Sequence, residues 1–261
     1  MILDDIVAAK RQEIDAAKQR LPPDELMRRV RGRRAERGFA EALRRSSRRP
    51  ALIAELKRKS PSRGMLRERF DPVSLAQQLQ EAGASALSIL TDERFFGGHL
   101  EFLRDAHQFT EVPCLRKDFL LDPYQLYEAA YYQADAVLLI VRLLTPAQLR
   151  HLLGVAGELG LDALVEVHAK AELTVALEAG AQLIGINQRD LSTFTMQPEL
   201  TAQLVAAIPP DRVIVAESGV HTADDVRRAR ELGVHALLIG ESLMTSPDVA
   251  AKIQDLFKAV W

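Results

Sequence analysis

Acidic and basic side chains stand at the ends of several short apolar runs in this sequence. Glu55 and Lys57 close the run ALIAELK, Lys117 closes CLRK, Glu166 lies in LVEVH, and Glu217 closes VIVAE. A lysine ammonium can donate a proton and a glutamate carboxylate can accept one, so these residue types around one cavity could perform general acid–base catalysis. That chemistry requires a fold that brings the five residues together.

Short apolar runs rich in Val, Ile and Leu alternate with amphipathic stretches from residue 51 onward. Near-continuous apolar runs are typical of parallel strands covered on both faces. The pairs Asp71-Pro72, Asp122-Pro123 and Thr145-Pro146 place a capping side chain before a first-turn proline, as at helix starts. We expect strands at about 51–57, 86–90, 112–117, 136–141, 163–168, 183–187, 212–217 and 236–240, with helices at about 72–82, 123–133, 145–160, 169–179, 223–232 and 247–258.

Eight strand–helix units of about 25 residues fit an α/β protein of the (β/α)8 TIM-barrel class. A doubly wound open sheet is the rival, and periodicity alone does not exclude it. Such a sheet usually has a Gly-rich phosphate turn after its first strand, where this chain has KRKSPSRG. We therefore favour a catalytic barrel over residues 51–261.

Residues 1–50 lie outside the repeat and contain fourteen Lys/Arg against eight Asp/Glu. Helical patterns fall near 3–19, 24–30 and 39–45. A basic arm could bind nucleic acid, but Phe39 is its only aromatic residue, so the stacking platforms of such arms are missing. We expect an N-terminal helical extension packed on the barrel.

The bulk composition argues against several classes of protein. The formal net charge is −2 over 261 residues, which gives no reason to expect nucleic acid or a membrane as partner. The N-terminus has acids where a signal peptide needs bases, and no apolar run approaches the roughly 20 residues of a membrane span. The single Cys114 suits a reducing compartment and reads as a small packing residue in the middle of the third strand. We expect a cytoplasmic protein, as a monomer or weakly associated.

The charged residues share strand faces with apolar ones. Alternate residues of a strand lie on one face, which groups Ile53 with Glu55 and Lys57. In a barrel, the carboxyl ends of the strands form the catalytic rim. Ion pairs that merely lock the rim are the alternative, but removing charges from water costs several kcal/mol per ion, so five such charges favour catalysis. By the same count Lys117 follows Leu115, Glu166 follows Leu164, Glu217 follows Val215, and Asn187 joins them at the end of the sixth strand.

A phosphate site is indicated at the last two strands. AESG at 216–219 and IGES at 239–242 each end a strand with a tight turn, where Gly219 and Gly240 let the backbone approach a ligand. Barrels frequently bind phosphate there. Ser60 and Arg189 could add a hydroxyl and a cation. The carboxylate of Glu241 would repel a phosphate, so any contribution from it would come from its backbone N–H.

Other candidates are weaker. Glu166 and His168 form E-x-H, but no third ligand at metal-like spacing accompanies them, so we read an ordinary histidine beside a rim carboxylate. Four phenylalanines in loops after strands could line a pocket for an aromatic substrate. They are Phe95, Phe96, Phe119 and Phe194.

Over essentially its whole length the chain resembles the indole-3-glycerol-phosphate synthase family of tryptophan biosynthesis. The resemblance rests on IAELKRKSPSRG at 53–64, LSILTDERFFGG at 87–98, LRKDFLLDPYQ at 115–125, LVEVH at 164–168, GINQRDL at 185–191, VAESGV at 215–220 and LIGESLM at 238–244. Gln188 and Arg58 are local variations away from the chemistry. The resemblance implies a carboxy-lyase that closes the indole ring of 1-(2-carboxyphenylamino)-1-deoxyribulose 5-phosphate, without metal or organic cofactor.

The resemblance also implies roles for individual residues. Lys117 would be the acid in ring closure and Glu166 the base or proton shuttle. Lys57 would bind the substrate carboxylate, and either lysine could be the acid in the later dehydration. The implied substrate-binding residues are Glu55, Ser60, Phe96, Phe119, Asn187, Arg189, Phe194, Glu217, Ser218, Gly219, Leu238, Gly240 and Glu241.

Three other readings stay open. Phosphoribosylanthranilate isomerase and the tryptophan synthase α subunit are phosphate-binding barrels of the same pathway. The isomerase would need a Cys/Asp pair at the rim, where Cys114 is not expected. A catalytically silent barrel that binds a phosphorylated ligand should have lost some rim charges, and this sequence keeps all of them.

Overall fold

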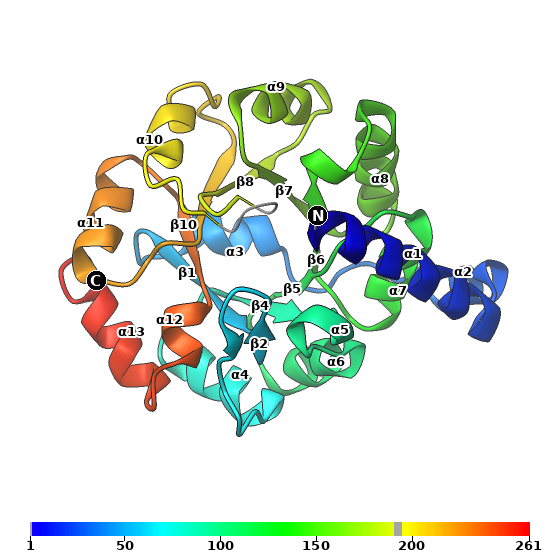
Figure 1. Ribbon diagram of the computed structural model, residues 1–261, viewed down its shortest axis with the longest axis horizontal. Coiled ribbons are helices and arrows are strands. Elements are labelled where there is room, and N and C mark those ends of the chain that lie inside the picture. Colours follow the sequence, from blue (N-terminus) through cyan, green and yellow to red (C-terminus); the bar gives the residue numbers. More distant parts are fainter. Residues whose placement is uncertain (1, 191–194) are drawn as a thin grey trace.

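The structure, a computed structural model, describes residues 2–190 and 195–261. Eight parallel strands close into a barrel in the order β1-β10-β9-β8-β7-β6-β5-β4, and helices surround them (Figure 1). The expected (β/α)8 barrel is therefore confirmed. Its strands are β1 (Ala51–Leu56), β4 (Ala86–Leu90), β5 (Cys114–Lys117), β6 (Ala136–Ile140), β7 (Asp162–Val167), β8 (Leu183–Asn187), β9 (Val213–Glu217) and β10 (Ala236–Ile239).

Capping side chains begin several of the outer helices, as expected. Asp71 accepts from the backbone N–H groups of the first turn of its helix, and Asp122 and Thr145 each form a reciprocal capping box. The outer helices are α4 (Pro72–Glu81), α6 (Leu100–Phe109), α7 (Pro123–Tyr131), α8 (Pro146–Glu158), α9 (Lys170–Glu178), α10 (Leu200–Val205), α11 (Ala223–Glu231) and α13 (Val249–Phe257).

The loops after the strands contain several short helices and strands. These elements are too short to produce a periodic pattern in the sequence, so they were not predicted. They are the hairpin of β2 (Lys59–Ser60) and β3 (Gly64–Met65), the helices α5 (Glu93–Phe96) and α12 (Glu241–Met244), and the 3-10 turn η1 (Val141–Leu143).

The other strand ends differ from the expected positions by at most one residue, but the start of the third strand differs by two. The third barrel strand, β5, starts at Cys114 instead of residue 112, so Cys114 is its first residue and not a central one. Pro113 has no N–H to donate to a ladder, which explains the late start. Cys114 is fully buried in the core, as expected of a packing residue.

The barrel interior confirms the strand faces expected from alternation. Ile53, Leu115, Leu164 and Val215 belong to one buried apolar cluster, together with Phe39 of α3 (Phe39–Arg45). The backbone N–H of Ala40 in α3 also donates to Asp162 at the start of β7, at 2.8 Å. Helix α3 therefore covers the amino-terminal end of the barrel, and the charged residues lie at the opposite end.

Helices α1 (Ile2–Arg20) and α2 (Pro23–Arg29) complete the N-terminal part, and both pack against α7 (Figure 1). The buried Nζ of Lys10 in α1 lies 3.0 Å from Asp92 and 2.9 Å from Asp118, in two loops at the carboxyl rim. Helix α1 is thereby tied to the rim. The division of the chain at residue 50 stays a prediction. Within the described ranges, no helix has both the length and the apolar character that crossing a membrane requires.

Candidate active site

A hollow at the carboxyl ends of the strands collects the residues singled out from the sequence. About 970 Å³ in and above this hollow is free of protein atoms, a volume that includes the part open to solvent. Phe194 lies outside the described residues, and Phe95 packs at the edge of an apolar cluster instead. The pocket is lined by Glu55, Lys57, Ser60, Phe96, Lys117, Phe119, Glu166, Asn187, Arg189, Glu217, Ser218, Gly219, Leu238, Gly240 and Glu241.

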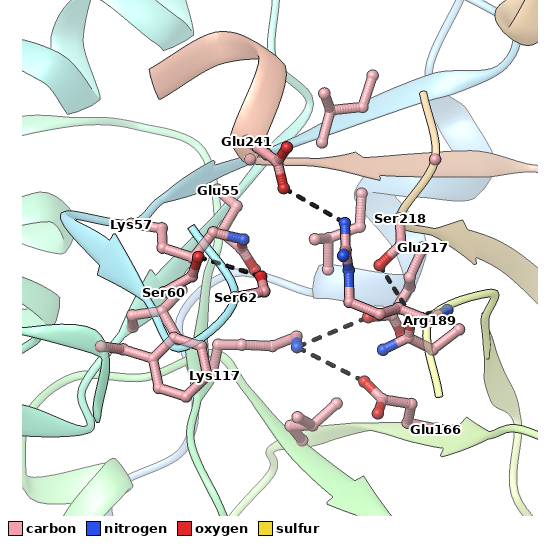
Figure 2. Close-up of a pocket in the computed structure, with 18 of the residues that line it drawn as sticks. Glu55, Lys57, Ser60, Ser62, Lys117, Glu166, Arg189, Glu217, Ser218 and Glu241 are labelled. Carbon is pink, nitrogen blue, oxygen red and sulfur yellow. Dashed lines mark hydrogen bonds and ion pairs between the residues drawn. The ribbon is translucent and has the colours of Figure 1, made fainter. Parts of the chain in front are cut away.

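Lys117 lies between two buried carboxylates at the bottom of this pocket. Its Nζ is 3.5 Å from Glu166 Oε2 and 3.7 Å from Glu217 Oε2 (Figure 2). Lys117 and Glu217 are the last residues of β5 and β9, and Glu166 is the second-last residue of β7, so closure of the barrel brings together strand ends that are far apart in the sequence. Carboxylates this close to an ammonium group stabilise its charged form.

The protonation states of these groups follow from burial and charge. Burial alone would lower the pKa of Lys117, but Glu166, Glu217 and Glu55 outweigh burial and raise it, so the ammonium keeps its proton. Burial also favours neutral carboxyl groups, yet Lys117 and His168 hold the pKa of Glu166 below its ordinary value. Burial and the charge of Glu166 raise the pKa of Glu217 well above the ordinary value. Neighbouring carboxyls pushed apart in this way suit one ionised base and one protonated donor.

A second lysine faces the same pocket. Lys57 directly follows β1, one residue past its end, and its Nζ lies 2.6 Å from Glu55 Oε1. Burial would raise the pKa of Glu55, but Lys57 and Lys117 lower it. The Lys57–Glu55 pair thus presents a cation at the wall opposite Glu166 (Figure 2).

The turn after β9 has the backbone geometry of a binding site. Ser218 and Gly219 both have positive φ, 66° and 78°, and such strain in a residue other than glycine concentrates at functional sites. Ser218 Oγ donates to Asn187 Oδ1 at 2.9 Å, and the backbone N–H of Arg189 donates to the same oxygen at 3.0 Å. Asn187 therefore fixes the two loops that follow β8 and β9.

Two arginines neutralise the acid at this end of the pocket. Glu241 lies 3.3 Å from Arg189 and 3.2 Å from the more exposed Arg63. Its side chain is thus an ion-pair partner. Arg63, in the turn of the β2–β3 hairpin, was not anticipated.

Glycines make room for two of the carboxylates, an arrangement that alternation along the strands does not predict. A side chain at Gly240 would collide with the carboxylate of Glu55, and one at Gly185 would collide with Glu217. An inward glycine within strand β8 was the available signal, because such a glycine often marks a close approach.

Apolar side chains form the pocket wall that faces away from the Ser218 turn. The rings of Phe96 and Phe119 lie 6.0 Å apart at a tilt of 41°. Leu138, Ile140 and Leu238 line the same pocket from the barrel interior. This wall suits a flat aromatic group, whereas the Ser218 end suits an anion.

His168 was read as an ordinary histidine, but it is buried and ion-paired. Its Nε2 lies 3.2 Å from Glu166 Oε1 and its Nδ1 3.4 Å from Glu172 Oε2. The i, i+4 spacing of His168 and Glu172 was the signal that could have shown this. Among residues 2–190 and 195–261, no cluster of three or more His, Cys, Asp or Glu side chains is arranged to hold a metal ion.

Fold and site together define the class: a TIM barrel with a buried cluster of lysines and glutamates between an apolar wall and a polar turn. The family model described as indole-3-glycerol phosphate synthase matches residues 3–256. The chain belongs to the indole-3-glycerol phosphate synthase family.

Relatives with that name match almost the whole chain. The protein from Roseiflexus castenholzii is 46% identical over 98% of this chain and 97% of its own. The one from Albidiferax ferrireducens is 46% identical over 98% of both chains, and one from Dehalococcoides mccartyi is 44% identical over 98% of this chain and 100% of its own.

Solved structures with low identity share the fold alone. The 3-hexulose-6-phosphate synthase from Salmonella typhimurium has a TM-score of 0.64 at 11% identity, covering 80% of this chain and 97% of its own. A mutant tryptophan synthase α subunit from Pyrococcus furiosus has a TM-score of 0.63 at 13% identity, covering 81% and 99%.

Proposed function

We propose that this chain is a carboxy-lyase that converts 1-(2-carboxyphenylamino)-1-deoxyribulose 5-phosphate into indole-3-glycerol phosphate, CO₂ and water. The observation that carries the proposal is the position of Lys117, 3.5 and 3.7 Å from two buried carboxylates in a pocket with one apolar and one polar wall. Membership of the family indicates which reaction to expect. The pocket contains apolar, cationic and polar groups that can bind the different parts of the substrate.

The substrate has an aromatic ring at one end and a phosphate at the other. We assign the ring to the wall of Phe96 and Phe119, with Phe194 as a further contact. The phosphate goes to the turn of Ser218 and Gly219, where backbone N–H groups and a hydroxyl can donate. Gly240, Ser60, Arg189, Leu238 and the backbone of Glu241 complete the proposed binding set.

Ring closure needs an acid at the ribulose carbonyl. As the aromatic carbon attacks, the Lys117 ammonium transfers a proton to the carbonyl oxygen, and a carbon–carbon bond forms. The C–CO₂⁻ bond then breaks and CO₂ leaves. The electron pair of that bond stays on the ring and restores its aromaticity. Lys57 is proposed to hold the carboxylate until that step, since it presents a cation at the pocket wall.

Dehydration needs an acid and a base. Either lysine ammonium donates a proton to the departing hydroxyl, which leaves as water, while the Glu166 carboxylate removes the proton that completes the indole. Its lowered pKa keeps Glu166 in the base form at neutral pH. Glu55, Asn187 and Glu217 orient the lysines and the substrate hydroxyls.

Indole fluorescence tests the proposal directly. The purified protein is given the carboxyphenylamino deoxyribulose phosphate, and product is followed by its emission. The expected result is turnover by the wild-type protein without added metal or cofactor. Absence of any indole signal would contradict the proposed function.

We also propose a cytoplasmic monomer. The single cysteine is buried at the start of β5, which agrees with a reducing compartment. Static light scattering tests the oligomeric state, and a mass of twice one chain would contradict a monomer. Fractionation of the source cells tests the location.

A further inference from the structure

A buried histidine lies behind the carboxylate proposed as the base. His168 follows the last residue of β7, and its ring is between Glu166 and Glu172, at 3.2 Å and 3.4 Å from the facing oxygens. The backbone N–H of His168 also donates to Glu172 Oε2, at 2.7 Å. His168 lies outside the pocket lining, so it reaches the pocket only through Glu166.

The positions of the two carboxylates favour a positive charge on the ring. An ionised carboxylate only accepts hydrogen bonds, and a neutral imidazole has one N–H and one lone pair. With a carboxylate beside each ring nitrogen, the neutral ring would direct a lone pair at one of them. A ring that carries both protons is attracted to both.

Both carboxylates have further cationic partners that keep them ionised. Arg142 Nε lies 2.9 Å from Glu172 Oε1, and Lys117 Nζ lies 3.5 Å from Glu166 Oε2. Burial would lower the pKa of His168, but Glu166 and Glu172 outweigh burial and raise it to about 9.

The ion pairs continue to the loop after β8. Arg142, in η1, also lies 2.9 Å from Asp190, the residue after Arg189. The series Glu166–His168–Glu172–Arg142–Asp190 therefore joins β7, α9 and η1 to the loop that carries a proposed phosphate ligand. On its pocket side, Glu166 faces Glu217 of β9, whose hydrogen bond lowers the pKa of Glu166, and Glu55 of β1, whose own pKa the charge of Glu166 raises.

We propose that His168 is a positioning residue of the reaction proposed above: as an imidazolium clamped between Glu166 and Glu172, it fixes the Glu166 carboxylate and keeps it ionised. One Glu166 oxygen faces the ring of His168 and the other faces Lys117, so the carboxyl group has two anchors. Without the ring charge, Lys117 would be the main cation holding Glu166 ionised against burial.

Three variants separate this role from mere packing. His168→Asn removes the charge, and Glu172→Gln removes the acid behind the ring at nearly the same size. His151→Asn is the matched control, because His151 is exposed on α8. For each, kcat and KM are measured as a function of pH by indole fluorescence.

His168→Asn is expected to lower kcat by about tenfold or more at neutral pH, with KM changed by less than about threefold. The acid limb of the pH profile should move to higher pH, because removal of a positive neighbour raises the pKa of Glu166. Glu172→Gln should shift the limb in the same direction by less, and His151→Asn should leave it unchanged.

Nitrogen NMR of the wild-type protein labelled at histidine adds a readout that does not depend on variant folding. Both ring nitrogens of His168 should carry protons at about pH 7.5 and lose one only near pH 9. A neutral His168 ring at pH 7.5, or a His168→Asn enzyme with wild-type kcat and an unshifted acid limb, would overturn the proposal. A wild-type protein without turnover would instead overturn the proposed function itself, and this inference with it.

Discussion

Lys10 offers a test of how strongly the N-terminal helix is tied to the rim of the barrel. Its side chain is 4% exposed and lies between Asp92 and Asp118, whose side chains are also buried. Lys10→Met keeps most of the methylene packing but leaves two carboxylates without their shared cation. Removing one partner of a buried ion pair costs about 3–5 kcal/mol.

The pKa of Asp118 gives an independent magnitude. Against burial, Lys10 and Arg116 lower it from 3.8 to about 2. A decrease of that size corresponds to roughly 2–3 kcal/mol. Because Arg116 remains in the variant, only part of this free energy is due to Lys10. The loss of the Lys10–Asp92 ion pair adds to the destabilisation. We therefore expect a loss of about 3 kcal/mol.

The same helix supplies the control. Lys18 pairs with Asp122 at 2.7 Å, but about a third of each side chain is exposed, and such pairs contribute about 1 kcal/mol or less. Urea unfolding of Lys10→Met and Lys18→Met, followed by circular dichroism, compares the two. Equal losses in both variants, or a loss below about 1 kcal/mol in Lys10→Met, would refute the reasoning.

Three further results are expected. Lys117→Met should lower turnover by at least about a hundredfold with an unchanged circular dichroism spectrum, and activity within tenfold of wild type would remove Lys117 from its role. Gly185→Ala should push the Glu217 carboxylate aside and lower kcat/KM by about tenfold or more. Gly154→Ala, in open space on α8, should leave kcat/KM unchanged, and equal activity of the two alanine variants would contradict the packing argument. The folded-state pKa of Asp118 is depressed, so its stabilisation is complete above pH 3.8 and is lost as the pH falls through about 2. Urea midpoints of wild type and Lys10→Met should accordingly converge between these pH values, and a constant difference would contradict this.

The strand faces and the rim were predictable because they follow from a local rule. Alternation along each run assigned Glu55, Lys117, Glu166 and Glu217 to the interior side, and barrel closure then places strand ends side by side. The residues expected at the site line one pocket, except Phe95, which packs at the edge of an apolar cluster, and Phe194, which lies outside the described residues.

Contacts between side chains from different parts of the barrel were not predictable from one sequence. That Gly185 leaves space for Glu217, or that Lys10 reaches Asp118, depends on distances between segments that no periodicity reports. The excess of basic residues in 1–50 did not indicate that one of them, Lys10, would be buried. The charge of Glu241 is evident from its residue type, whereas its arginine partners, Arg189 and Arg63, are not.

The glycines beside Glu55 and Glu217 make space for charged side chains inside this barrel. Barrels of this class normally fill their centre with stacked layers of branched hydrocarbon side chains. Here the layer nearest the carboxyl ends of the strands contains carboxylates and an ammonium group. Gly185 and Gly240, which have no side chain, leave the space that the carboxylates occupy. Exchanging that layer for well-packed leucine and valine would yield a more durable but inert protein. Directed evolution for heat resistance alone should therefore erode activity first at these inward positions.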